Sequence, residues 1–377
     1  RITGKGYVGG VIDTGTDAGH PDLAGQELSG KDYTGKGTSK DGNGHGSWCF
    51  GHVFALRDGK GTVGGAYGAK GRTYKVLSDQ GSGYTTDIAK GIDQAVADKC
   101  DVISMSLGSR QPDPDTLAAI KRAIAAGVIV CCAAGNDGPG QNTVGYPGGY
   151  AATLPLVLCV AAHDVTGLTA RFSSRGAAVT LTCGGVNTKA TWIGGQYAAI
   201  DGTSMATPTA MSLALLWLEA GGGRLPKQDR PAAFVDALVK SCDLYPQRNV
   251  SRGYGRPDAT KLCAAVPPVV PPQPPAERTI TVDTPELRAQ GIKRLVVVVD
   301  GATPVPSAVP VYQPQPQPVR GHWVPPVSQP WYPPVAYPTP QAMPAPVCGP
   351  GGCPGGVCPT PAPAQWYPGQ RIIQWIR

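Results

Sequence analysis

Proline placement divides this chain more sharply than any other feature. Residues 1–265 contain 11 of the 39 prolines, and the other 28 lie in residues 266–377. Proline has no backbone N–H and breaks helices and central strands, so long regular elements can form only in the first region. We therefore expect one globular domain over residues 1–265 and a different kind of chain beyond it.

Short apolar segments alternate with helical patterns inside that first region. Asp115 reads as a helix start and Gly127 as the stop of the same helix. The expected strands are Tyr7–Ile12, Thr73–Leu77, Val102–Met105, Val128–Cys132 and Leu156–Ala161, and the expected helices are Thr86–Asp98, Asp115–Ala126, Ser204–Glu219 and Ala232–Lys240. Parallel strands buried on both faces give such short apolar runs. The alternation predicts an α/β fold with a parallel sheet.

The region after residue 265 is predicted in three parts. Residues 266–278 form a proline-rich linker, and residues 279–300 could form a small strand–turn–strand segment. Residues 301–377 form a proline- and glycine-rich tail of low complexity that we expect to be largely unstructured. Its cysteines Cys348, Cys353 and Cys358 lack the usual spacing of zinc ligands, so we expect no metal there.

Charge and hydropathy exclude some classes of function. The net charge of +7 comes without a long basic run, so we do not expect nucleic-acid binding. No apolar run approaches the roughly 18 residues of a membrane span. The chain begins at Arg1 rather than Met, so a signal or pro-segment would have been removed or lost.

The cysteines number eleven, so they cannot all pair within one chain. Cys242 with Cys263 is the one pair that we single out as a candidate disulfide. Six others lie in or beside apolar runs and are expected to be small buried hydrophobes, namely Cys49, Cys100, Cys131, Cys132, Cys159 and Cys183.

Ser204 is the candidate nucleophile. It lies in Gly202-Thr203-Ser204-Met205-Ala206, where a glycine turn leads into an expected helix. That position places the hydroxyl at the positive end of the helix dipole, beside backbone N–H groups. An ordinary serine N-cap would give the same local pattern, so the hypothesis needs a base and an orienting group elsewhere.

His45 and Asp13 are the candidate base and its orienting carboxylate. Of the five histidines, His45 alone has a glycine on both sides, which allows close backbone approach. Asp13 ends an apolar run, and a buried carboxylate requires a hydrogen-bonding partner. Asn136, in Ala133-Ala134-Gly135-Asn136, follows an expected strand and is the candidate oxyanion donor.

Taken in order, these motifs resemble the subtilisin family of serine proteases. The likeness covers about residues 5–265 and is carried by Val11-Ile12-Asp13-Thr14-Gly15, Gly42-Asn43-Gly44-His45-Gly46, Ser104-Met105-Ser106-Leu107-Gly108, Ala133-Ala134-Gly135-Asn136 and Gly202-Thr203-Ser204-Met205-Ala206. It implies a three-layer fold with a mainly parallel sheet and helices on both faces. It also implies an Asp13–His45–Ser204 triad with Asn136 as oxyanion donor.

The resemblance further implies how substrate is held. A peptide or protein substrate would lie as an extended strand between two edges, and small residues would line the pocket for the side chain before the scissile bond. The edges are Gly81, Ser82, Gly83 and Ser106, Leu107, Gly108, and the pocket residues are Ala133, Ala134 and Gly135. Broad specificity with a preference for large apolar side chains is expected, because no charge is evident in that pocket.

A structural calcium ion, export from the cytoplasm and an inhibitory pro-segment upstream of Arg1 are also implied by the family likeness. Asp22 and Asp58 match ligand positions, and carbonyls of the loop 56–62 could complete the oxygen shell. The chain departs from the family at Trp48, Phe50 and Thr209, where larger or different side chains could reshape the packing behind His45.

The resulting prediction is a secreted or extracytoplasmic serine endopeptidase. One alternative is a catalytically idle binding protein that acts through its proline-rich tail, whose partner is unknown. Another is an esterase that uses the same triad. Labelling with a serine-directed fluorophosphonate separates the first alternative from an enzyme, and a comparison of peptide with ester substrates separates the second.

Overall fold

The computed structural model describes residues 1–266, 278–282, 295–299 and 372–375. These residues fall into two compact units. One unit contains residues 1–266 and 372–375, and the other contains the two strands at residues 278–282 and 295–299. The predicted features of residues 301–371, including the three tail cysteines, lie outside the described residues, and the boundaries predicted for the linker and tail stay a prediction.

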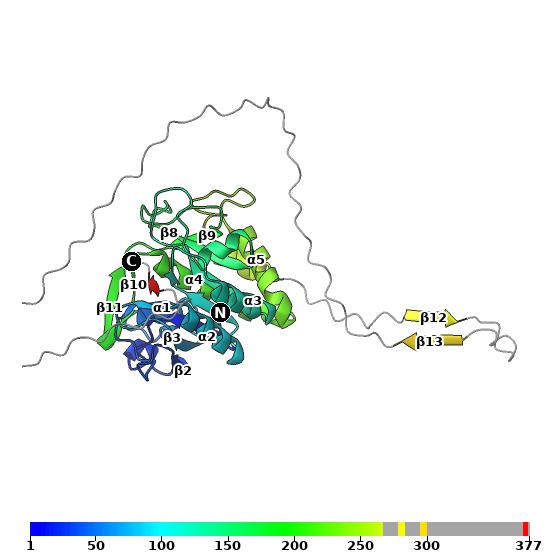
Figure 1. Ribbon diagram of the computed structural model, residues 1–377, viewed down its shortest axis with the longest axis horizontal. Helices are drawn as coiled ribbons and strands as arrows, with labels where there is room; N and C mark the ends of the chain where they lie inside the picture. The colour runs from blue at the N-terminus through cyan, green and yellow to red at the C-terminus, as the bar shows by residue number, and fades with distance from the viewer. Residues whose placement is uncertain (267–277, 283–294, 300–371, 376–377) are drawn as a thin grey trace, which may run out of the picture. The chain divides into compact units, whose positions relative to one another are not determined.

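A seven-stranded parallel sheet forms the centre of the first unit (Figure 1). Its strands, in spatial order, are β2 (Glu27–Asp32), β3 (Lys70–Lys75), β1 (Val8–Asp13), β5 (Val102–Met105), β7 (Ile129–Ala133), β8 (Val157–His163) and β9 (Leu181–Gly184). The predicted α/β class with a parallel sheet is confirmed. In such sheets, sites form where the strands end at their carboxyl edge.

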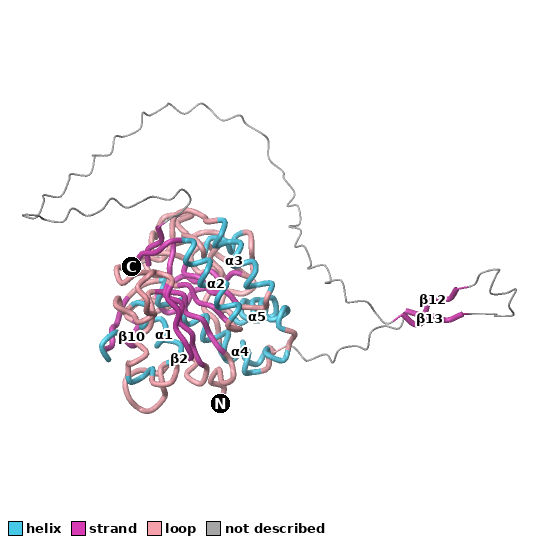
Figure 2. Tube along the Cα trace, turned by 60° about the horizontal axis from the view of Figure 1, so that its bottom comes forward, coloured by secondary structure: helices cyan, strands magenta, loops and turns pink. Residues whose placement is uncertain are grey.

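Helices cover both faces of this sheet and give the predicted three layers (Figure 2). One apolar core includes side chains of α1 (His45–Phe54), α4 (Thr203–Ala220), α5 (Arg230–Ser241) and α6 (Ala259–Ala264). The opposite core includes those of α2 (Thr85–Ala97) and α3 (Pro114–Ala125). Along β7 the side chains alternate between them, with Ile129 and Cys131 in the first core and Val130 and Cys132 in the second.

The start of α3 lies one residue before the prediction. Asp113, rather than Asp115, caps the helix, because its carboxylate accepts the Thr116 amide at 2.8 Å. Pro114 then occupies the first turn, where its missing N–H costs nothing. The helix ends just before Gly127, which has a φ of +80°.

A hairpin that the sequence did not predict packs on α1. It consists of β10 (Thr188–Trp192) and β11 (Gln196–Ile200), which pair antiparallel. The Trp48 indole donates to the Ala198 carbonyl at 2.9 Å, and the Thr191 hydroxyl donates to the Ser47 carbonyl at 2.7 Å. Two polar bonds in an otherwise apolar contact therefore fix this hairpin against α1.

The remaining elements are short. Among the described residues the 3-10 helices are η1 (Pro21–Leu23), η2 (Gly148–Ala152), η3 (Ile193–Gly195), η4 (Gly222–Arg224) and η5 (Lys227–Asp229). In the second unit, β12 (Arg278–Val282) pairs antiparallel with β13 (Leu295–Val299). No helix in the described part of the chain is long and apolar enough to cross a membrane.

Every cysteine among the described residues is a free thiol. The six that were expected to be buried are buried. The candidate disulfide between Cys242 and Cys263 is wrong, because both residues are free thiols. The Cys242 thiol instead donates to the Leu238 carbonyl of its own helix at 3.3 Å.

Candidate active site

Asp13 and His45 meet at the carboxyl end of β1. Asp13 is the last residue of that strand and is fully buried. Its Oδ1 lies 2.8 Å from His45 Nδ1 and also accepts the Thr14 amide at 2.7 Å. A carboxylate in this position fixes the tautomer of the imidazole, since Nδ1 must carry the hydrogen that Asp13 accepts.

His45 is the first residue of α1, and its position depends on the glycine before it. Gly44 has a φ of +110°, and a Cβ at this position would lie 2.3 Å from the Trp192 ring. Burial alone would lower the pKa of His45, but the Asp13 carboxylate and the Cys49 thiol outweigh burial. The pKa of His45 therefore lies well above its ordinary value.

Cys49 lies one helical turn after His45 and contacts the site directly. Its Sγ is 4.0 Å from His45 Nδ1 and 3.8 Å from the Ser204 carbonyl oxygen. Burial raises the pKa of this thiol, against the opposing effect of His45. Trp48 stacks on His52, and Phe50 packs against Phe54; that these residues reshape the packing behind His45 stays a prediction.

Ser204 is the second residue of α4, so it lies at a helix start as the Gly202–Ala206 motif predicts. Gly202 precedes the helix with a φ of +155°. The Ser204 hydroxyl donates to the Ser106 carbonyl at 3.0 Å, and the Ser106 hydroxyl donates to the Ser204 carbonyl at 2.9 Å. This reciprocal pair joins the start of α4 to the segment that follows β5.

Asn136 lies beside this helix start with its amide orientation fixed. Its Oδ1 accepts the Thr203 amide at 3.0 Å and the Thr203 hydroxyl at 2.9 Å. The Thr203 hydroxyl in turn accepts the Gly135 amide at 3.1 Å. With the oxygen held, Asn136 Nδ2 is buried without a hydrogen-bond acceptor among the described residues. An unused donor of this kind costs free energy unless a ligand accepts it.

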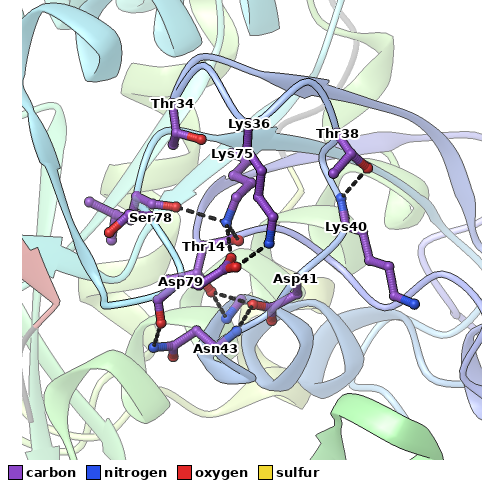
Figure 3. A network of polar contacts seen from close by, with 12 residues as sticks. Thr14, Thr34, Lys36, Thr38, Lys40, Asp41, Asn43, Lys75, Ser78 and Asp79 are labelled. Atoms are coloured by element: carbon purple, nitrogen blue, oxygen red, sulfur yellow. Dashed lines mark hydrogen bonds and ion pairs between the residues drawn. The ribbon is translucent and has the colours of Figure 1, made fainter. Parts of the chain in front are cut away.

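A polar network around the buried Lys75 lies beside Thr14, the residue that follows Asp13 (Figure 3). The Lys75 side chain is fully buried, and its amine donates to the carbonyls of Thr14 and Leu77 and, at 2.9 Å, to the Asp79 carboxylate. Lys36 pairs with the same carboxylate. Hydrogen bonds from Lys36 and then Lys75 outweigh the effect of burial and hold the pKa of Asp79 below its ordinary value.

Asp41 joins the start of α1 to the end of β1. Its Oδ1 accepts the Thr14 hydroxyl and the Gly44 amide, each at 3.0 Å. Its Oδ2 accepts the Ser47 amide at 2.9 Å and the Ser47 hydroxyl at 2.8 Å. Figure 3 shows Thr14, Asp41 and Asn43 grouped at this junction. Asp41, Lys75 and Thr203 were not predicted to have a role, although Thr203 lies within the quoted serine motif and Asp41 immediately precedes the quoted histidine motif.

The two predicted substrate edges lie in one small sheet. It has the order β4 (Ser82–Tyr84), β14 (Ile372–Trp375) and β6 (Leu107–Gly108), and β14 is antiparallel to both neighbours. Figure 1 draws β14 as the short red strand. Ile372–Trp375 belongs to the tail that was predicted to be largely unstructured, and these four residues form a strand. Of the predicted edge residues, Gly81 and Ser106 immediately precede these strands.

The predicted pocket residues continue from the end of β7. Ala133 and Ala134 are buried, and Gly135 has a φ of +109°. A Cβ on Gly135 would lie 2.9 Å from the Ser174 hydroxyl. This segment therefore leads directly into Asn136 with no charged side chain among its three residues.

The family model for Peptidase_S8, the subtilase family, matches residues 4–256. The chain belongs to the subtilase family. The resemblance inferred from the motifs is therefore confirmed, and the matched region contains every residue of the predicted site.

Curated relatives agree with this membership of the subtilases. An intracellular serine protease of Paenibacillus polymyxa is 40% identical over 225 residues, 57% of this chain and 68% of the relative. Subtilisin DY of Bacillus licheniformis is 37% identical over 226 residues, 58% and 80% respectively. Subtilisin Savinase of Lederbergia lenta is 36% identical over 232 residues, 61% and 80%. The chain is a serine-type endopeptidase.

The predicted calcium ligands of this subtilase lie near each other at one loop. Asp22 is buried and accepts the Thr62 amide at 2.8 Å, whereas Asp58 is exposed and accepts the Lys60 amide at 3.0 Å. Burial, a hydrogen bond to Asp22 and the charges of Asp22 and Asp58 raise the pKa of Tyr197. In the described part of the chain, no group of three His, Cys, Asp or Glu ligands includes either aspartate.

The other described histidines have structural contacts. His20 Nε2 lies 2.9 Å from the Gln196 carbonyl oxygen, and His163 Nδ1 lies 2.7 Å from the Asp164 carbonyl oxygen. His52 contacts the Thr209 hydroxyl at 2.9 Å, and burial lowers the pKa of His52 to about 4. Thr209, a departure from the family pattern, thus binds a neutral imidazole. His322 lies outside the described residues.

Proposed function

We propose that this subtilase cleaves peptide bonds with Ser204 as nucleophile, His45 as general base and Asp13 as the group that orients His45. The contact of 2.8 Å between His45 Nδ1 and Asp13 Oδ1 carries this proposal. With the hydrogen of the neutral imidazole on Nδ1, the other ring nitrogen, Nε2, is the one that can accept a proton. The proton of the Ser204 hydroxyl then passes to His45 during attack and from His45 to the leaving amine.

Asn136 is proposed to stabilise the oxyanion of the tetrahedral intermediate. The observation that supports this role is the buried Nδ2, whose amide oxygen is held by Thr203. A donor fixed in place before the reaction stabilises charge as it develops without paying for reorientation. Backbone N–H groups at the start of α4 supply further donors.

Replacement of the nucleophile tests the mechanism. Ser204→Ala is expected to abolish both peptide hydrolysis and labelling by a fluorophosphonate probe, because no other group supplies the attacking oxygen. The thermal melt of the purified variant should match that of the unsubstituted protein. Hydrolysis near the unsubstituted rate by a folded variant would overturn the assignment.

Substrate preference is proposed to follow the uncharged segment Ala133–Gly135. A pocket without charge favours large apolar side chains before the scissile bond, because burying a charged side chain there would be uncompensated. The test compares kcat/KM for matched peptides with Phe, Leu, Lys or Glu at that position. Equal values for Glu and Phe would contradict the preference.

A structural calcium ion is proposed at Asp22 and Asp58. Both carboxylates act on the same Tyr197 hydroxyl, so negative charge is concentrated beside the loop 56–62. Calcium binds such oxygen donors and would tie the loop to η1. Removal of calcium with a chelator should lower the melting temperature, and Asp58→Ala should abolish that response. Identical melts with and without chelator would contradict the site.

An extracytoplasmic location is proposed from the family resemblance alone. The named relatives include both an intracellular serine protease and subtilisins, so the comparison leaves the compartment to experiment. Cell fractionation with an antibody against residues 1–266 is the test. Recovery of the protein in the cytosolic fraction alone would contradict export.

A further inference from the structure

The chain supplies its own strand to the predicted substrate cleft. β4 and β6 pair with no other strand among the described residues and do not pair with each other. They are separated by one strand position, which corresponds to two interstrand spacings, or about 9–10 Å. Ile372–Trp375 fills that position as β14.

The register is continuous across both edges. On one side Ile372, Ile373 and Gln374 pair with Tyr84, Gly83 and Ser82. On the other side Gln374 and Trp375 pair with Gly108 and Leu107. Gln374 is thus the residue that lies opposite both edges in the register.

The direction of β14 leads toward the nucleophile. From Gln374 to Trp375 the partner on β6 moves from Gly108 to Leu107. The next residue of that edge is Ser106, whose carbonyl accepts the Ser204 hydroxyl at 3.0 Å. β14 therefore runs between the two edges in the direction of Ser106, the residue that contacts Ser204.

We propose that Ile372–Trp375 is an internal ligand of this cleft that competes with peptide substrates and so inhibits the enzyme. The inference rests on the proposed function, because it uses the same two edges as substrate sites. Recognition is through backbone hydrogen bonds, as when an extended peptide adds to a sheet edge. Because the segment is tethered, it competes even when its affinity as a free peptide is weak.

A proline in the full-length chain tests the proposal. Gln374→Pro removes a backbone N–H at the residue that pairs with both edges and should release the segment. If the segment fills the cleft about nine-tenths of the time, release raises kcat/KM for a short chromogenic peptide about tenfold. Gln341→Pro is the matched control and should leave kcat/KM unchanged. Equal kcat/KM in all three active proteins would overturn the proposal while leaving the proposed function intact.

A binding experiment decides the proposal without turnover. A fluorescent peptide of residues 370–377 is titrated into the full-length Ser204→Ala protein with and without Gln374→Pro. Saturable binding that is tighter when the internal segment is released supports the proposal, even if no variant hydrolyses peptides and the proposed function fails. Absence of binding to the Gln374→Pro protein overturns it. Specific activity that rises on dilution would assign the occupant to a second copy and overturn the internal assignment.

Discussion

The two sides of the active site are built with different chemistry. The carboxylate side, defined as Asp13, His45, Asp41, Lys75 and Asp79, is built on ionisable side chains, of which all but the half-buried Asp79 are buried, with Asp13 against His45 and Lys75 against Asp79. The amide side, defined as Asn136, Thr203 and Ser204, is held by neutral hydrogen bonds and keeps one donor unused. A buried carboxylate that is always charged needs partners in the resting enzyme. A site that stabilises an oxyanion formed only during the reaction needs a hydrogen-bond donor that is unused in the resting enzyme.

Asp13→Asn gives the largest expected effect, because it removes the charge that the carboxylate side is built around. Turnover should fall by about ten-thousandfold, the scale observed when an amide replaces the carboxylate of such a triad. Loss of the Asp13 charge also removes a cause that raises the pKa of His45. A base acts when neutral, so activity is lost as pH falls through that pKa.

The acid limb of the residual pH–rate profile should therefore move to lower pH in Asp13→Asn. Profiles of kcat/KM for the two proteins measure this shift. A limb at unchanged pH would show that the Asp13 charge does not control the titration of His45.

On the amide side, Asn136→Leu should lower kcat by about 100- to 1000-fold with little change in KM. Leucine is close in size but has no donor, and the lost bond strengthens only as charge develops. Steady-state kinetics separate the two constants. Full kcat with a raised KM would make Asn136 a substrate-binding residue.

Thr203→Val tests whether the hydroxyl that orients the Asn136 side-chain amide contributes to kcat. The hydroxyl of Thr203 links Asn136 Oδ1 to the Gly135 amide. A neutral hydrogen bond contributes about 1 kcal/mol, so kcat should fall by about three- to tenfold. Thr203→Ser keeps the hydroxyl and should restore kcat. Equal losses in both variants would point to packing instead.

Lys75→Met should have the smallest effect on turnover and a clear effect on stability. It leaves the buried carbonyls of Thr14 and Leu77 without this donor and leaves the Asp79 carboxylate with Lys36 as its lysine partner, which costs about 1–3 kcal/mol of unfolding free energy. Lys36→Met is the matched control, since its side chain is 45% exposed and pairs with the same carboxylate. That pair should contribute less than about 1 kcal/mol. Equal losses in urea melts would contradict a special role for the buried lysine.

Sequence patterns predicted five of the seven strands of the sheet, all but β2 and β9, and the motifs of the candidate triad, because these signals are local. Val102–Met105 is recovered with the predicted bounds, and Asp13, His45, Asn136 and Ser204 each follow a strand or begin a helix. α1 was missed because its glycines weaken the helical pattern. The contacts of Lys75 and Thr203 depend on side chains far apart in the sequence, so no local pattern reveals them.

The strand β14 was missed for a related reason. Four residues in a proline-rich region carry too little periodicity to predict pairing, and the partner edges lie more than 250 residues earlier. Asp113 was overlooked as a cap because Asp115 also precedes the apolar stretch. The deciding contact is backbone pairing for β14 and a side-chain carboxylate that accepts a backbone amide for Asp113, and residue type alone specifies neither.

The hairpin β10–β11 bears on how the enzyme loses activity through cleavage by other copies of itself. Because Trp48 and Ser47 of α1 are bonded to it, detachment of the hairpin removes two of the bonds that hold the helix carrying His45. Local opening of this kind is often cheaper than unfolding of the whole domain. For a protease, a molecule opened at the hairpin is also a substrate for its neighbours, and cleavage there is irreversible. The working lifetime of the enzyme would then be set by the lability of one exposed hairpin rather than by the strength of its core.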